Sequence, residues 1–125
     1  MFRKFLQRDD MPRPREAAPA VSVVVIAYDM AAQAERTVRS LFSDYQLGVC
    51  AADYEVIVVE NESRNLLDSD FVEALPDNFR YFLRRDAEPS PAAAINFGAS
   101  QARGEHICIM IDGARMLTPG VMRSL

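Results

Sequence analysis

Residues 21–27 read Val-Ser-Val-Val-Val-Ile-Ala, and this stretch decides the fold class. It is almost wholly apolar and rich in β-branched residues, which favour extended backbone. A strand with one face in water alternates polar and apolar residues, whereas a strand covered on both faces has a continuous apolar run. We therefore expect residues 21–27 to form a parallel strand in a sheet that carries helices on both faces.

Three further runs have the same apolar character, over residues 54–59, 79–83 and 106–111. Helices are predicted between them, because apolar residues recur at helical spacing over 31–45 and a shorter such segment spans 70–75. Strand and helix alternate, and each connection is long enough for a right-handed parallel crossover. The sequence therefore predicts a Rossmann-like parallel sheet flanked by helices.

The ends of these helices are predicted from local chemistry. Asp29 is expected to cap the first helix, and Gly48 suits its end or the turn beyond it. Ser90 and Pro91 form a typical helix start, with the serine as cap and the proline in the first turn. Gly104 is expected to terminate that helix.

The chain divides into a flexible arm and linker over residues 1–20 and a single α/β domain over 21–125. Three prolines and mixed charge within residues 9–20 indicate the linker.

No stretch of about twenty apolar residues occurs, so no membrane span is expected. The two cysteines match no metal-ligand spacing. We expect a cytoplasmic protein, with the basic and apolar residues 1–6 available to contact the inner membrane face.

Composition excludes several function classes. The formal charge of -4 provides no basic face for nucleic acid. No Gly-x-Gly-x-x-Gly follows the first strand and no phosphate-loop lysine motif occurs, which argues against dinucleotide and P-loop nucleotide sites. A receiver-like signalling domain would need a lysine at a late strand end, and the one lysine is Lys4.

Polar residues gather where the predicted strands end. Tyr28-Asp29, Glu60-Asn61, Arg84-Arg85 and Asp112 each follow an apolar run. Ligands of open parallel sheets bind beyond the carboxyl ends of the strands. The sequence thus predicts a binding site at this edge, where the paired arginines either meet phosphate or are simply solvated.

Four segments in this order resemble family 2 glycosyltransferases. Residues 21–29 are similar to the family's first strand, and 54–63 to its second strand with the Asp-Asp-Gly-Ser turn. Residues 93–105 resemble its Ala-Ala-Arg-Asn-x-Gly helix and Gly-Glu exit, and 109–112 fall where its Asp-x-Asp begins. The resemblance covers about residues 21–120. It implies a GT-A fold, a nucleoside diphospho-sugar donor, usually a UDP-sugar, and inversion at the anomeric carbon.

Position by position, the resemblance implies these donor-binding residues: Ala27, Tyr28, Asp29, Glu60, Asn96 and Asp112. Tyr28 would offer its ring to uracil, or else pack at the strand end. Glu60 would read the base, since a carboxylate accepts a strong hydrogen bond from the uracil N3–H. Asp112 would lie by the ribose or the diphosphate.

The departures from the family pattern concern charge and metal binding. Ile26, Glu62 and Ile95 replace a proline, a turn glycine and an arginine. Asp112 is followed by Ala114 where the family has its second aspartate, so Asp112 is the one candidate ligand for Mn²⁺ or Mg²⁺ and the site would be weak. Arg115 is either an exposed loop residue or a cation that replaces part of the metal's charge on the diphosphate.

Two readings of function remain open at this point. In the first, the chain is the donor-binding half of a longer transferase; the general base is then expected beyond the C-terminus, and the chain alone would be inactive. In the second, the missing aspartate marks a non-catalytic nucleotide-sugar-binding module. The acceptor is unknown in both, and the open edge of a truncated sheet would favour self-association.

Overall fold

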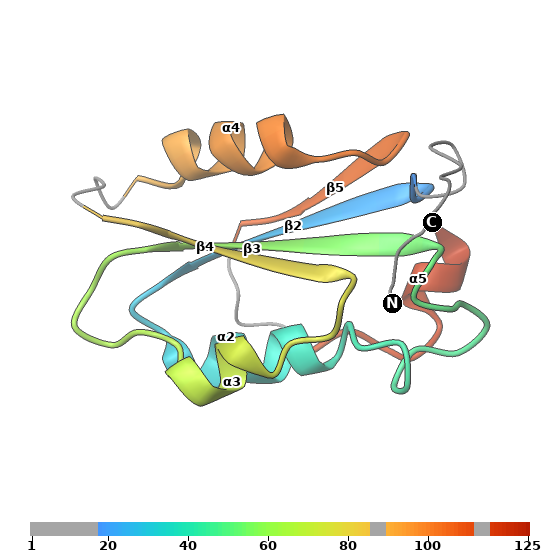
Figure 1. Cartoon of the computed structure of the whole chain (residues 1–125), viewed down its shortest axis with the longest axis horizontal. Coiled ribbons are helices and arrows are strands. Elements are labelled where there is room, and N and C mark those ends of the chain that lie inside the picture. The colour runs from blue at the N-terminus through green and yellow to red at the C-terminus, as the bar shows by residue number, and fades with distance from the viewer. Residues whose placement is uncertain (1–17, 86–89, 112–115) are drawn as a thin grey trace, which may run out of the picture.

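Four parallel strands form one sheet in the order β4-β3-β2-β5. They are β2 (Val21–Tyr28), β3 (Tyr54–Asn61), β4 (Phe79–Arg84) and β5 (His106–Met110). The computed structural model describes residues 18–85, 90–111 and 116–125 (Figure 1). Residues 1–17, most of the expected arm, lie outside this range. The predicted parallel α/β architecture is confirmed.

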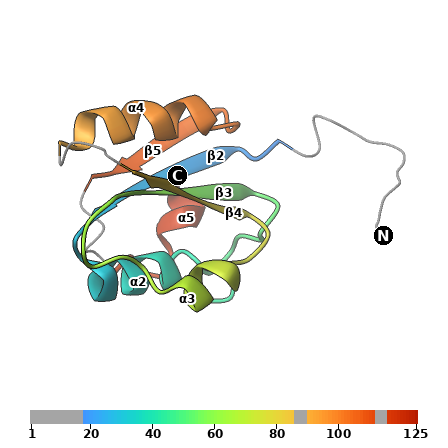
Figure 2. The same cartoon turned by 60° about the vertical axis from the view of Figure 1, so that its left-hand side comes forward.

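Helices cover both faces of the sheet. Helix α4 (Pro91–Gln101) lies on one face, and α2 (Ala31–Arg39) and α3 (Ser69–Glu73) lie on the other (Figures 1 and 2). The short α5 (Val121–Ser124) lies on the same side as α2. Because side chains alternate along a strand, each central strand contributes to two separate apolar cores.

The two cores explain why the strands are continuously apolar. Val23, Val25, Val56 and Val58 pack with α2 and α3, while Val24, Ile26, Ile57 and Val59 pack with Ala94 of α4. All eight residues of β3 and the first seven of β2 are buried. Burial on both faces therefore selects apolar residues at odd and even positions alike.

Three predicted helix ends are wrong in detail. Asp29 does not cap α2, because it adopts a left-handed backbone (φ 55°) and the cap position is Met30, with no side-chain cap bond. Helix α2 ends at Arg39, well before residue 45. Gly104 does not terminate α4, which ends at Gln101; its amide instead donates to the Ser22 hydroxyl at 2.8 Å.

Other local predictions are confirmed. Ser90 is the cap of α4 and accepts a hydrogen bond from the Ala92 amide, with Pro91 in the first turn. Gly48 has φ 78° in the turn after α2, a backbone that suits glycine. Strand β5 pairs only with β2 among the described strands, and Ile107 and Ile109 are partly exposed there. Self-association through this edge stays a prediction.

Gly98 lets α4 lie close to the sheet. A methyl group at this position would lie 2.4 Å from Val24 Cγ1, inside the buried core. We expect Gly98→Ala to lower the free energy of unfolding by about 1–3 kcal/mol, because overpacking outweighs the better helix propensity of alanine. Urea denaturation measures this change.

The Val24→Ala background is the control for Gly98→Ala, since it removes the methyl group that would clash. There, Gly98→Ala should cost much less, which gives a coupling energy of about 1 kcal/mol or more. Equal costs in both backgrounds would contradict the close contact between α4 and Val24.

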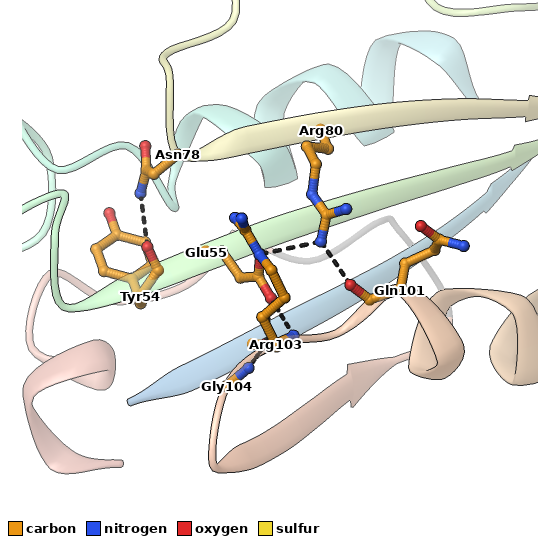
Figure 3. Close-up of polar contacts among 8 residues, drawn as sticks. Tyr54, Glu55, Asn78, Arg80, Gln101, Arg103 and Gly104 are labelled. Carbon is orange, nitrogen blue, oxygen red and sulfur yellow. Dashed lines mark hydrogen bonds and ion pairs between the residues drawn. The ribbon is translucent and has the colours of Figure 1, made fainter. Parts of the chain in front are cut away.

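A buried carboxylate, not anticipated from the sequence, joins the amino-terminal half of the sheet. Glu55 of β3 is 2% exposed and accepts hydrogen bonds from the Ser22 hydroxyl at 2.6 Å and the Arg103 amide at 2.7 Å. The guanidinium groups of Arg80 and Arg103 each approach it at 3.0 Å. Figure 3 shows Arg80 between Glu55 and the Gln101 carbonyl, to which it donates at 2.6 Å. This network ties β2, β3, β4 and the exit of α4 together.

Candidate functional site

A hollow of about 610 Å³ opens at the carboxyl ends of β2 and β3. These two strand ends lie at the left in Figure 1. Its lining residues are Tyr28, Asp29, Glu62, Ser63 and Arg64. Tyr28 is the last residue of β2, Asp29 follows it, and the other three residues begin the loop after β3. This volume is in the range of small-molecule sites. The lining combines an aromatic ring, two acids, a hydroxyl and a cation.

The register of the two central strands decides which side chains can line the hollow. Tyr28 pairs with Asn61, and Ala27 pairs with Glu60. Neighbouring residues in a strand point to opposite faces, so Tyr28 and Asn61 lie toward the α4 face while Ala27 and Glu60 lie toward the α2 face. Tyr28 remains 40% exposed at the strand end, which leaves its ring accessible to a ligand.

Glu60 does not line this hollow. Its side chain has no exposed surface, and both carboxylate oxygens accept from the Leu67 amide, at 3.2 and 3.1 Å. The Tyr81 hydroxyl donates to the same carboxylate at 2.5 Å. Burial raises the pKa of Glu60 above its usual value, and the hydrogen bonds from Tyr81 and Leu67 only partly oppose this. Tyr28 and Glu60, both predicted to bind the donor, therefore lie toward opposite faces of the sheet, and only Tyr28 lines the hollow.

Asn61 is a site-edge residue to which the sequence analysis assigned no role. It is fully buried; its amide oxygen accepts from Arg84 at 3.2 Å, and its amide nitrogen lies 3.5 Å from the Ser90 carbonyl. Asn61 thereby links the end of β3 to the end of β4 and the start of α4. The sequence shows that Asn61 and Arg84 each follow an apolar run. Only the register of β3 on β4 shows that the two residues are partners.

Arg84, the last residue of β4, and Arg85, which follows it, contact Glu62 at the edge of the hollow. Arg85 forms an ion pair with Glu62 at 3.1 Å, and the Arg84 carbonyl accepts from the Glu62 amide at 3.0 Å. Both contacts hold the start of the loop after β3. Neither arginine lines the hollow itself.

The comparison with protein families decides the identity. The model of glycosyl transferase family 2 matches residues 22–113, which include β3, β4, β5, all of β2 except Val21, and the lining of the hollow. The chain belongs to glycosyl transferase family 2. No match to a curated protein was found. The parallel sheet with helices on both faces is the α/β GT-A arrangement that the resemblance implied.

In this member of glycosyl transferase family 2, the remaining predicted donor residues have different surroundings. Ala27 is buried in the core beneath α2 and does not line the hollow. Asn96 lies exposed on α4. Asp112, Ala114 and Arg115 lie outside the described residues. Their roles stay predictions.

The residues that the structure describes contain neither a metal-ligand cluster nor a membrane-spanning helix. No group of three or more His, Cys, Asp or Glu side chains there is arranged to hold a metal ion. None of the described helices has the length and apolar character needed to span a bilayer.

Proposed function

We propose that this chain supplies the donor-binding half of an inverting glycosyltransferase that uses a UDP-sugar and transfers the sugar to a hydroxyl group. The observation that carries the proposal is the hollow at the carboxyl edge, in which the half-exposed ring of Tyr28 faces a loop with a cation. Ligands of parallel sheets bind at this edge, and the family match covers it.

Four of the five lining residues have a chemical use for a nucleoside diphosphate. The Tyr28 ring provides a face on which uracil stacks. The Asp29 carboxylate accepts hydrogen bonds from ribose hydroxyls, and the Ser63 hydroxyl can donate to them or accept from them. The Arg64 guanidinium suits a diphosphate oxygen, because it offers charge and two parallel donors.

The reaction itself needs a base and a stabilised leaving group. The acceptor hydroxyl loses its proton as its oxygen attacks the anomeric carbon, and UDP leaves from the opposite face. We assign no general base among residues 21–125. Because the sequence has Ala114 in place of a second aspartate, we propose that the Arg115 guanidinium supplies part of the positive charge for the leaving diphosphate.

Calorimetry of the full chain with UDP, GDP and CDP tests the nucleotide class. We expect UDP to bind about tenfold more tightly than the others, since a misfitting base loses about one hydrogen bond. Adding Mn²⁺ should improve UDP affinity by less than about tenfold, and Arg115→Ala should weaken it by a similar factor. Absence of any nucleotide binding would contradict the proposed function. If Mn²⁺ improves UDP affinity by more than about tenfold, also in Arg115→Ala, the proposed role of Arg115 is wrong, but the proposed nucleotide binding is unaffected.

A non-catalytic nucleotide-sugar-binding module is the second candidate, favoured by Ala114. Such a module binds UDP-sugar without breaking the glycosidic bond. Phosphorus NMR of UDP-sugars with the protein tests this candidate, because release of UDP above the buffer rate would contradict a non-catalytic module. Binding without release agrees with both candidates, since we assign no general base to the donor-binding half.

A further inference from the structure

Three segments meet at the buried Glu60 carboxylate. Glu60 is the next-to-last residue of β3, Tyr81 comes from the middle of β4, and Leu67 lies between β3 and α3. The Leu67 amide lies within 3.2 Å of both carboxylate oxygens, and the Tyr81 hydroxyl donates at 2.5 Å to one of them. Glu60 is 0% exposed and Leu67 is 6% exposed. Water therefore cannot replace these hydrogen bonds without opening the core.

The loop closed by this contact carries most of the hollow's lining. Residues 62–66 leave β3 at Glu62, whose amide donates to the Arg84 carbonyl at 3.0 Å. They return at Leu67, whose amide donates to Glu60. Glu62, Ser63 and Arg64 lie between these two fixed points and line the hollow. Fixing both ends of a short loop reduces the number of conformations available to its side chains.

The chemistry of the contact suits a positioning role. A buried amide without an acceptor is destabilising, so the Leu67 amide stays buried because the Glu60 oxygens accept its hydrogen bond. Burial also raises the pKa of the Glu60 carboxyl and that of the Tyr81 hydroxyl, and Arg85 only partly opposes the rise at Tyr81. The Glu60 carboxylate thus accepts its hydrogen bonds from groups of the protein itself.

We propose that Glu60 and Tyr81 form a clasp that sets the conformation of residues 62–66, so that nucleotide affinity depends on two side chains that do not line the hollow. The proposal rests on the proposed function for its ligand. It assigns both residues a positioning role, and it replaces direct reading of the base by Glu60.

Tyr81→Phe tests the clasp, because it removes one hydroxyl and keeps the ring. Hydrogen exchange of the Leu67 amide, followed by NMR without nucleotide, should become about tenfold faster, and UDP affinity should fall about tenfold. Tyr54→Phe is the matched control: it removes a buried hydroxyl that donates to the Leu41 carbonyl, away from the hollow. This control should leave UDP affinity unchanged.

The outcomes separate the clasp from the alternatives. Glu60→Gln keeps an oxygen acceptor and should retain Leu67 protection and UDP affinity within about threefold. A loss above about tenfold with Leu67 protection intact would show direct reading of the base and overturn the proposal. Equal losses in Tyr81→Phe and Tyr54→Phe would overturn it too, as would unchanged Leu67 exchange in Tyr81→Phe. If the wild-type chain binds no UDP, the proposed function fails, and Leu67 exchange still decides whether the clasp holds the loop.

Discussion

Replacing Glu55 by alanine should lower the free energy of unfolding by about 3–5 kcal/mol, the largest single effect that we expect on stability. Glu55 is 2% exposed and is the shared acceptor of Ser22, Arg80 and Arg103. Its removal leaves these donors without their acceptor and opens a space between β2 and β4. Urea denaturation at neutral pH measures the loss.

Glu35→Ala is the control, because Glu35 forms an exposed ion pair with Arg39 one helical turn away. Exposed pairs of this kind contribute about 0.3–0.5 kcal/mol, so Glu35→Ala should leave stability nearly unchanged. A similar small effect for Glu55→Ala would mean that the buried network does not hold the sheet.

The stabilisation by Glu55 should depend on pH with a definite sign. Burial alone would raise the pKa of this carboxyl, but hydrogen bonds from Ser22 and Arg103 outweigh it and lower the pKa below 4.5. The unfolded chain therefore takes up the proton first as pH falls. The stability difference between wild type and Glu55→Gln should be constant above about pH 5.5 and should shrink as pH falls below 4.5 through the folded-state pKa. Comparing the two proteins cancels the opposite contribution of Glu60, whose pKa is raised.

The second large effect concerns the ligand. Tyr28→Ala should weaken UDP binding about ten- to a hundredfold, because stacking of a base on an aromatic ring contributes about 1–3 kcal/mol. Tyr28 lines the hollow and is 40% exposed, so its truncation should change the unfolding midpoint little. Calorimetric titration with UDP gives the affinity, and thermal unfolding without ligand checks the fold.

Tyr28→Phe keeps the ring and removes only the hydroxyl, so it should bind UDP within about threefold of wild type. If Tyr28→Phe loses as much affinity as Tyr28→Ala, the hydroxyl and not the ring contacts the nucleotide. If neither variant loses affinity, the nucleotide binds elsewhere, and the hollow between β2 and β3 is not the donor site.

The fold could be predicted from local sequence patterns, because the order of apolar and polar residues depends on which faces of a strand or helix are buried. The continuous apolar run of residues 21–27 requires cover on both faces, and the structure provides α4 on one face and α2 with α3 on the other. Ser90-Pro91 predicted the start of α4 because a cap involves neighbouring residues alone. Asp29 was misassigned as a cap, since its left-handed backbone is set by the turn between β2 and α2.

The sequence by itself determined the parallel α/β sheet, the family and the edge that carries the hollow, because burial pattern and motif order are properties of short segments. Only the tertiary structure decided which polar side chains share a space. Tyr81 reaches Glu60, and Arg103 reaches Glu55, across separations of 21 and 48 residues. Such partners are set by strand register and by the face on which each residue lies. Register and face therefore bury Glu60 in the core and leave Tyr28 at the surface of the hollow.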